Sequence, residues 1–229
     1  MKWRSLEESA AGPDLRPLRE IFAERKDLIA KYVPAGIRAI HSRAIAELNE
    51  KKIADNSLSA ATKAPVFQLQ DQNAKSVSSA DLLTKGHLVI CFIRGRWCPF
   101  CVGQLEAMNQ ILPQIKRAQA SLVAISPQTV QQSFFMADQH KLGFPLLSDP
   151  GNSVAREFGL SYRVPDDQQE VYRRVFINLP FSNGDESWEL PIPATYIIDR
   201  NGSVLFSSVN ADYTERPEPA EILSQLAAD

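Results

Sequence analysis

An apolar run that leads directly into a pair of cysteines most constrains what this chain can fold into. The run, HLVICFI at residues 87–93, is almost entirely apolar, and therefore predicts a strand buried on both faces of a sheet. Cys98 and Cys101 follow within RGRWCPFC, where an apolar pattern with helical spacing begins. The sequence thus predicts a central strand, a short loop and a helix that starts at the cysteine pair.

Strand and helix patterns alternate around this segment, which predicts an α/β fold with a central sheet flanked by helices. Asn201-Gly202 lies between two apolar runs and is typical of a hairpin turn, because Asn-Gly accepts positive φ. Pro113 is expected to kink its helix. The expected strands are 66–71, 87–93, 121–126, 145–149, 194–199 and 203–208, and the expected helices are 101–120, 130–141, 152–159 and 218–229.

The beginning of the chain has a different pattern. Between Leu15 and Leu48, apolar residues recur at helical spacing around an interruption at Pro34, which predicts two amphipathic helices. We therefore expect a helical extension over residues 1–58, followed by one α/β domain over residues 59–229. The two helices either cover that domain or form a homodimer interface.

Charge and composition narrow the functional classes. The chain has 25 Lys and Arg against 27 Asp and Glu, and no basic stripe, so we expect no nucleic-acid partner. Since no apolar run approaches the roughly 20 residues that span a bilayer, we expect no membrane association. The first 15 residues lack the apolar stretch of a signal peptide, which favours a cytoplasmic protein.

The cysteine pair admits a metal site, a structural disulfide or redox chemistry. A structural zinc site normally needs four ligands, but the chain has only one further cysteine and three scattered histidines, so we expect no metal. That third cysteine, Cys91, lies inside the apolar strand and is interpreted as a small buried hydrophobe. Structural disulfides are rare in reducing compartments, which favours a redox role for Cys98 and Cys101.

The position of the pair gives it a chemical consequence. The positive end of a helix dipole and its free N–H groups stabilise a thiolate, so a cysteine there is expected to have a lowered pKa. Trp97 is expected to shield the pair as an apolar neighbour. Arg94 and Arg96 are either solvated charges at the strand end or groups that stabilise the anion.

Several segments resemble the thioredoxin-fold superfamily, and within it the peroxiredoxin-like proteins of the AhpC/TSA family. The residues that carry the resemblance are APVFQLQDQNAKSVSSADLL, FPLLSDPGNSVAREFGL and PATYIID. The helical extension, the tail YTERPEPAEIL and the insertion YRVPDDQQEVYRRVFINLPFSNGDESWELP resemble a subgroup that carries Trp-Cys-Pro-x-Cys. The resemblance implies a thioredoxin fold for the α/β domain.

The resemblance implies two different roles for the cysteines. Aligned with the peroxiredoxin motif Pro-x-x-x-Thr-x-x-Cys, Cys101 takes the peroxide-attacking position, Cys98 replaces Thr and Arg94 replaces Pro. Pro193 stands where peroxiredoxins have an activating Arg and where thioredoxins have a cis-proline. In thioredoxins the first cysteine attacks, which here is Cys98.

These observations predict an enzyme that uses a dithiol–disulfide cycle at Cys98 and Cys101, with Pro193, Trp97, Arg94 and Arg96 in support and no cofactor. The resemblance favours hydroperoxide reduction, with electrons from a thioredoxin-like protein or glutathione. One alternative is a thioredoxin-like oxidoreductase that acts on protein disulfides. The other is a non-catalytic binding module of the same fold.

Overall fold

The computed structural model describes residues 14 and 16–227. The N-terminal residues on which the expectation of no signal peptide rests are almost all among residues 1–13 and 15, and they lie outside the described residues. The same holds for Leu15, the first residue of the expected helical run, and for the last two residues of the expected closing helix.

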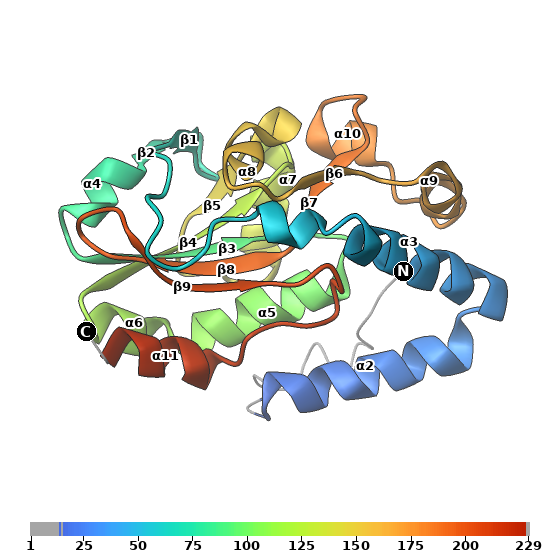
Figure 1. Cartoon of the computed structure of the whole chain (residues 1–229), viewed down its shortest axis with the longest axis horizontal. Helices are drawn as coiled ribbons and strands as arrows, with labels where there is room; N and C mark the ends of the chain where they lie inside the picture. Colours follow the sequence, from blue (N-terminus) through green and yellow to red (C-terminus); the bar gives the residue numbers. More distant parts are fainter. Residues whose placement is uncertain (1–13, 15, 228–229) are drawn as a thin grey trace.

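A seven-stranded mixed sheet forms the centre of the molecule (Figure 1). Its strand order is β2-β1-β5-β4-β3-β8-β9, with β3 parallel to β4 and antiparallel to β8. The strands are β1 (Gln68–Gln70), β2 (Ser76–Ser78), β3 (His87–Phe92), β4 (Ala120–Ser126), β5 (Leu146–Ser148), β8 (Ala194–Ile198) and β9 (Val204–Val209). Residues 88–92 of β3 are fully buried, as the apolar run predicts.

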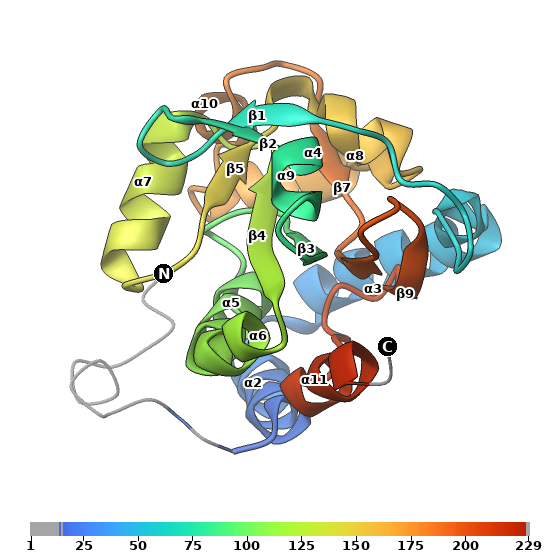
Figure 2. The ribbon, with the colours of Figure 1, turned by 90° about the vertical axis from the view of Figure 1, so that its left-hand side faces the viewer.

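Helices cover both faces of this sheet, which confirms the predicted α/β class (Figures 1 and 2). One face packs under α5 (Pro99–Gln110), α6 (Leu112–Arg117), α7 (Val130–Gln139) and α11 (Pro219–Ala227). The other face packs under α4 (Ser79–Leu83) and α8 (Ser153–Glu157), with η2 (Pro150–Asn152) leading into α8. The hairpin predicted around Asn201-Gly202 is β8 and β9.

The single kinked helix predicted over residues 101–120 is wrong in two respects. It begins earlier, at Pro99, because proline suits the first turn of a helix, where its missing N–H has no partner to lose. It is also two helices rather than one, because Ile111 leaves the helical conformation (φ −91°, ψ 3°) and Pro113 falls in the first turn of α6. Cys98 is therefore the N-cap of α5, and Cys101 lies in its first turn.

The N-terminal helices pack onto the domain. They are α2 (Leu18–Tyr32) and α3 (Ala35–Glu50), followed by the short 3-10 helix η1 (Ile53–Asn56). Phe22 is buried on α2 and meets the ring of Phe100 edge-on, with 5.1 Å between centroids.

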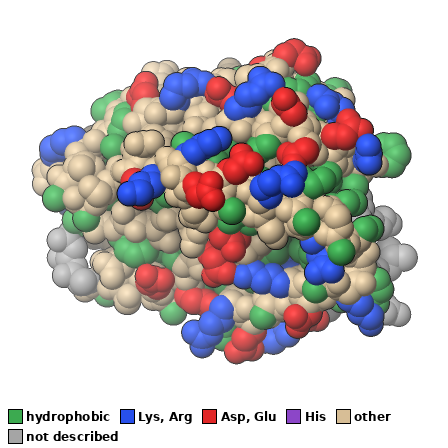
Figure 3. Space-filling model, turned by 45° about the vertical axis from the view of Figure 1, so that its right-hand side comes forward, with side chains coloured by type: hydrophobic (Ala, Val, Ile, Leu, Met, Phe, Trp, Pro, Cys, Tyr) green, Lys and Arg blue, Asp and Glu red, His purple; other side chains and the backbone are tan. Residues whose placement is uncertain are grey.

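Figure 3 turns the side of Figure 1 that carries α3 and α9 toward the viewer, and acidic and basic side chains are interspersed across it.

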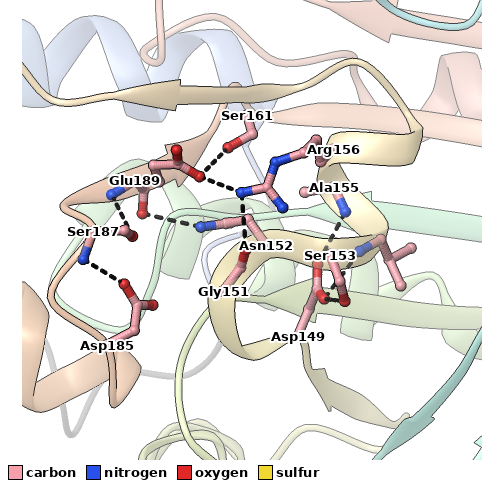
Figure 4. Close-up of polar contacts among 11 residues, drawn as sticks. Asp149, Gly151, Asn152, Ser153, Ala155, Arg156, Ser161, Asp185, Ser187 and Glu189 are labelled. Atoms are coloured by element: carbon pink, nitrogen blue, oxygen red, sulfur yellow. Dashed lines mark hydrogen bonds and ion pairs between the residues drawn. The ribbon is translucent and has the colours of Figure 1, made fainter.

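The insertion in the second half of the chain forms a small annex beside the main sheet. It comprises β6 (Ser161–Arg163), α9 (Asp166–Arg174), α10 (Leu179–Asn183) and β7 (Glu189–Pro191), with β6 and β7 paired. Figure 4 shows how it is fixed: Arg156 pairs with Glu189 at 2.6 Å, and Asn152 donates to the Glu189 carbonyl. Asp149 holds the start of α8 by accepting from the N–H groups of Val154 and Ala155. Residues of the annex between Val171 and Ser182 line the site described next.

Candidate active site

Cys98 and Cys101 lie at the junction between β3 and α5, where the sequence places them. Both are free thiols and are almost fully buried, with 1% and 0% of their surface exposed. The loop before them is held by the Cys98 N–H, which donates to the Gly95 carbonyl at 3.1 Å. The sheet and the first turn of α5 thus fix both sulfur atoms relative to one another.

Two hydrogen bonds are directed at the sulfur of Cys101. The backbone N–H of Arg94 donates to Cys101 Sγ at 3.4 Å. The Nη2 group of Arg216, from the segment between β9 and α11, lies 3.7 Å from the same sulfur. Arg216 is in turn fixed by Gln104, whose Oε1 accepts from its Nε at 2.8 Å.

The two thiols consequently differ in acidity. Burial alone disfavours a Cys101 thiolate, but the Cys98 thiol, Arg216 and Arg94 together outweigh burial and lower the pKa of Cys101 to about 5. The pKa of Cys98 is raised, first by burial and then by the neighbouring Cys101. The lowered pKa expected at this helix start therefore belongs to Cys101, and the pair holds one thiolate at neutral pH.

Arg94 is buried inside an aromatic enclosure beside the pair. Its guanidinium carbon lies 4.0 Å from the Tyr213 ring centre and 4.8 Å from that of Trp97, and its Nη2 donates to the Tyr172 hydroxyl. Among the residues that the structure describes, no carboxylate forms an ion pair with Arg94. A buried cation is costly without an opposite charge, and the charge of Arg94 accordingly favours a thiolate at the cysteine pair.

Arg96 and Trp97 are neighbours in the loop before Cys98, but their side chains contact different parts of the molecule. Arg96 is exposed and directs its Nη1 to Gln132 Oε1 on α7 at 3.0 Å, away from the contacts made by Arg94. Trp97 is half-buried and its ring covers the Arg94 guanidinium, while its shielding of the cysteine pair stays a prediction. Of the two arginines that sequence reasoning singled out, the structure places only Arg94 within the charged surroundings of the cysteines.

Pro193 lies at the end of the neighbouring strand. Ala194 of β8 pairs with Phe92 of β3, so Pro193 flanks the loop that leads to the cysteines. Its peptide bond to Ile192 is trans, since none of the described residues has a cis bond. The likeness to thioredoxins at this position is therefore weakened, because their proline there is cis.

Cys98 opens onto a cleft of about 1580 Å³, whereas Cys101 does not line it. The cleft runs between α2 and α3 on one side and the annex on the other. Its apolar lining includes Ile29, Val33, Ile37, Ile177 and Phe181, and its charged lining includes Arg25, Lys26, Arg38, Arg94, Arg96, Lys141, Glu106 and Asp212. Cys98 is thus the sulfur nearer to an entering molecule.

Sequence reasoning missed the residues that complete this site from distant segments. Arg216 lies 115 residues beyond Cys101, inside a proline-rich tail that shows no periodic pattern. Tyr172 comes from the insertion and Tyr213 from the loop after β9. Their only sequence signal was that they fall in segments typical of the resembled subgroup, and that signal did not assign them a role.

Two general properties concern the described part of the chain as a whole. Within residues 14 and 16–227, no group of three or more His, Cys, Asp or Glu side chains is arranged to hold a metal ion. None of the helices in the same residues combines the length and apolar content needed to cross a bilayer.

Comparison with known proteins identifies relatives. The chloroplastic peroxiredoxin Q of Sedum lineare is 34% identical over 140 residues, covering 61% of this chain and 63% of that protein. The chloroplastic peroxiredoxin Q of Oryza sativa subsp. japonica is 30% identical over 178 residues, covering 76% and 71%. The chain thus spans less than two thirds of the length of the Sedum protein.

A solved structure supports the fold. Peroxidoxin BcpB from Mycobacterium tuberculosis superposes with a TM-score of 0.59 at 21% identity, covering 75% of this chain and 97% of that one. This likeness confirms the predicted thioredoxin fold. The model of the AhpC/TSA family matches residues 60–207, which include both cysteines and most of the sheet. The chain therefore belongs to the AhpC/TSA family.

Proposed function

We propose that the chain is a thiol-dependent peroxidase in which Cys101 attacks a hydroperoxide and Cys98 resolves the product. Family membership and the similarity to peroxiredoxins support the reaction class. The observation that carries the assignment is the pair of groups on Cys101 Sγ, the Arg94 N–H at 3.4 Å and Arg216 Nη2 at 3.7 Å. Arg216 supplies the cation that the sequence lacks at Pro193.

The reaction follows from these contacts. The Cys101 thiolate attacks one peroxide oxygen, the O–O bond breaks, and the departing oxygen takes a proton to leave as an alcohol or water. The sulfur loses two electrons and becomes a sulfenic acid. Donors near the sulfur stabilise the charge that develops on the peroxide oxygens. The Cys98 thiol then displaces water from that sulfenic acid and closes a disulfide, which an external thiol reduces.

Access to the pair is a requirement of this mechanism. With 1% and 0% of their surface exposed, neither sulfur meets an acceptor without a movement that widens the cleft at Cys98. The cleft has room for a bulky organic hydroperoxide as well as for hydrogen peroxide. We therefore propose both as acceptors.

One observation favours a second function, the exchange of protein disulfides. Cys98, rather than Cys101, lines the cleft, and a thioredoxin-like enzyme attacks with the first cysteine. Two features count against it: the pKa of Cys98 is raised, chiefly by burial, and the Ile192–Pro193 bond is trans. A non-catalytic binding module would not require an acidic Cys101.

The remaining partners follow from the same proposal. A thioredoxin-like protein or glutathione restores the dithiol, in a reducing compartment such as the cytoplasm. A homodimer through the N-terminal helices stays a prediction. In this structure α2 and α3 already cover the domain, which leaves less of their apolar surface for a partner.

A rapid-mixing experiment tests the proposed function. Hydrogen peroxide, an organic hydroperoxide and an oxidised model protein are each mixed with the wild-type chain and with Cys98→Ser. We expect both peroxides to oxidise both proteins, with Cys98→Ser stopping at a trappable sulfenic acid on Cys101. Oxidation by the protein disulfide alone, lost in Cys98→Ser, would establish disulfide exchange instead. No reaction with any oxidant would favour the binding module.

A further inference from the structure

Segments from the two ends of the chain meet beside the cysteine pair. The helix α2 lies next to α11 and below α5 in both views of the ribbon (Figures 1 and 2). The segment that precedes α11 carries Arg216. Both this segment and α2 lie outside residues 60–207, the part of the chain that matches the family model.

Glu218 joins the two segments. Its carboxylate accepts hydrogen bonds from the backbone N–H groups of Leu18 at 2.9 Å and Arg19 at 2.8 Å, across about 200 residues of sequence. These are the first two residues of α2, and the N-cap residue Pro17 offers no side-chain acceptor. The Glu218 carboxylate therefore caps the N-terminus of α2 in place of an N-cap side chain. Its negative charge also faces the positive end of the helix dipole.

A second ion pair holds the same two segments together. Lys26, two turns along α2, pairs with Glu215, so that acidic residues on both sides of Arg216 bind α2. Between them, Arg216 points inward to Gln104 and to Cys101 Sγ. Glu215 and Glu218 thus bind the segment before α11 to α2, while Arg216 of the same segment contacts Gln104 and Cys101.

The helix α2 is also attached to the start of α5. Arg25 donates to the Pro99 carbonyl, directly after Cys98. Phe22 packs against Phe100, and a Cβ at Gly103 would clash with Arg25 Nη1 and with the Phe22 ring, so α2 lies close against α5. The helix therefore connects the element that carries the cysteines to the segment that carries Arg216.

We propose that Glu218 is a positioning residue, which caps α2 and thereby holds Arg216 against Cys101. An arginine side chain has many rotamers, and a 3.7 Å contact with sulfur stabilises little unless the segment behind it is fixed. The N-terminal helix thus sets the reactivity of the thiol without touching it. This inference deepens the proposed function, because Arg216 acts there on the attacking sulfur.

The test measures thiolate formation and needs no peroxide. In a chain with Cys91→Ala and Cys98→Ser, Cys101 is the single cysteine, and its thiolate is followed by ultraviolet absorbance against pH. The groups that face it are Arg94, Arg216 and the serine at position 98. We expect Glu218→Ala and Arg216→Met each to raise the midpoint by about one pH unit, which lowers the thiolate fraction about fivefold at the pH of the parent's midpoint.

Combining the variants separates positioning from a general loss of structure. We expect Glu218→Ala to change nothing further in the Arg216→Met background, because its effect passes through Arg216. Glu218→Gln, which keeps an acceptor oxygen, should recover part of the loss. Glu221→Ala, which removes an exposed acid one turn further along, is the matched control and should match the parent.

Other outcomes would overturn the inference. An unchanged midpoint in Glu218→Ala, or an equal shift with and without Arg216, means that Glu218 does not act through Arg216. Circular dichroism identifies any variant that fails to fold, and Glu218→Gln then replaces Glu218→Ala in the cycle. If the chain reduces no peroxide but Glu218→Ala still shifts the midpoint, the proposed function fails and the positioning role stands.

Discussion

Cys91 and Cys101 form a natural comparison, because both are fully buried and lie ten residues apart. Burial raises the pKa of Cys91 to about 12, since the Thr195 hydroxyl and the charge of Arg216 oppose it only in part. At Cys101 the same burial is outweighed by the Cys98 thiol, Arg216 and Arg94, and the pKa falls to about 5. Burial therefore does not by itself determine the pKa of these cysteines; the groups directed at the sulfur decide its direction.

The side chain of Gln104 connects the surroundings of the two cysteines. Gln104 donates from Nε2 to Thr195 Oγ1 at 2.9 Å and accepts from Arg216 through Oε1. One amide thus links the residue beside Cys91 to the cation on Cys101. Cys91 lies within β3, whereas the charges that act on Cys101 come from Arg94 in the loop after β3 and from Arg216 in the segment before α11.

The largest expected effect is on peroxide consumption, which substitution of Cys101 should abolish and substitution of Cys91 should leave almost unchanged. Cys101→Ser should lower peroxide consumption by about 10³-fold or more, because a hydroxyl at this position is not ionised at neutral pH. Cys91→Ala should change it by less than about twofold, since a thiol with a pKa near 12 supplies no thiolate at neutral pH. Peroxide consumption in a coupled assay measures both, and similar losses in the two variants would contradict the comparison.

Removing the cation from Cys101 should have the next largest effect. Arg216→Met should slow the peroxide step at pH 7 by about 10- to 100-fold, the typical cost of losing one stabilising donor at a reacting centre. Arg216→Lys should retain part of the rate because it keeps the charge. Stopped-flow oxidation of each variant provides the measurement, and a rate for Arg216→Met equal to wild type would leave the cation without a role.

A smaller difference in the rate of the peroxide step is expected between variants of Arg94 and Arg96, the two arginines of the loop before the cysteines. Arg94→Ala should slow the peroxide step several-fold, because Arg94 contributes positive charge to the sulfur pair from within its aromatic enclosure. Arg96→Ala should leave the rate unchanged, since its guanidinium is bound to Gln132 on α7. Unchanged rates in both variants would show that neither charge reaches the reacting sulfur.

The smallest expected effect concerns stability alone. Cys91→Ala should lower the free energy of unfolding by about 1–2 kcal/mol, because it leaves a small cavity in the centre of β3. The pH dependence of Cys101 ionisation should not change. Chemical denaturation measures the first quantity and thiolate absorbance the second; a shift in ionisation would mean that Cys91 is part of the reactive site.

The sequence predicted those parts of the molecule that depend on local pattern. The buried strand, the helix start and the place of Cys98 and Cys101 all follow from apolar runs and from residues close together in the chain. Arg216, Glu218 and Tyr172 could not be predicted in this way, because tertiary packing brings them to their partners across 78 to 200 residues. The break at Ile111 was missed for a related reason: apolar spacing continues through it, and only the backbone shows where one helix ends.

The most direct test of the account is a titration of two single-cysteine chains, one retaining only Cys101 and the other only Cys98, with serine at the partner position and alanine at 91. Thiolate absorbance is recorded against pH in the folded protein. We predict that the Cys101 chain titrates below the ordinary pKa of a thiol, because Arg94 and Arg216 still act on its sulfur, and that the Cys98 chain titrates above it, because burial disfavours its thiolate. An acidic midpoint in the Cys98 chain, with none in the Cys101 chain, would assign the attacking thiolate to Cys98 and contradict the account.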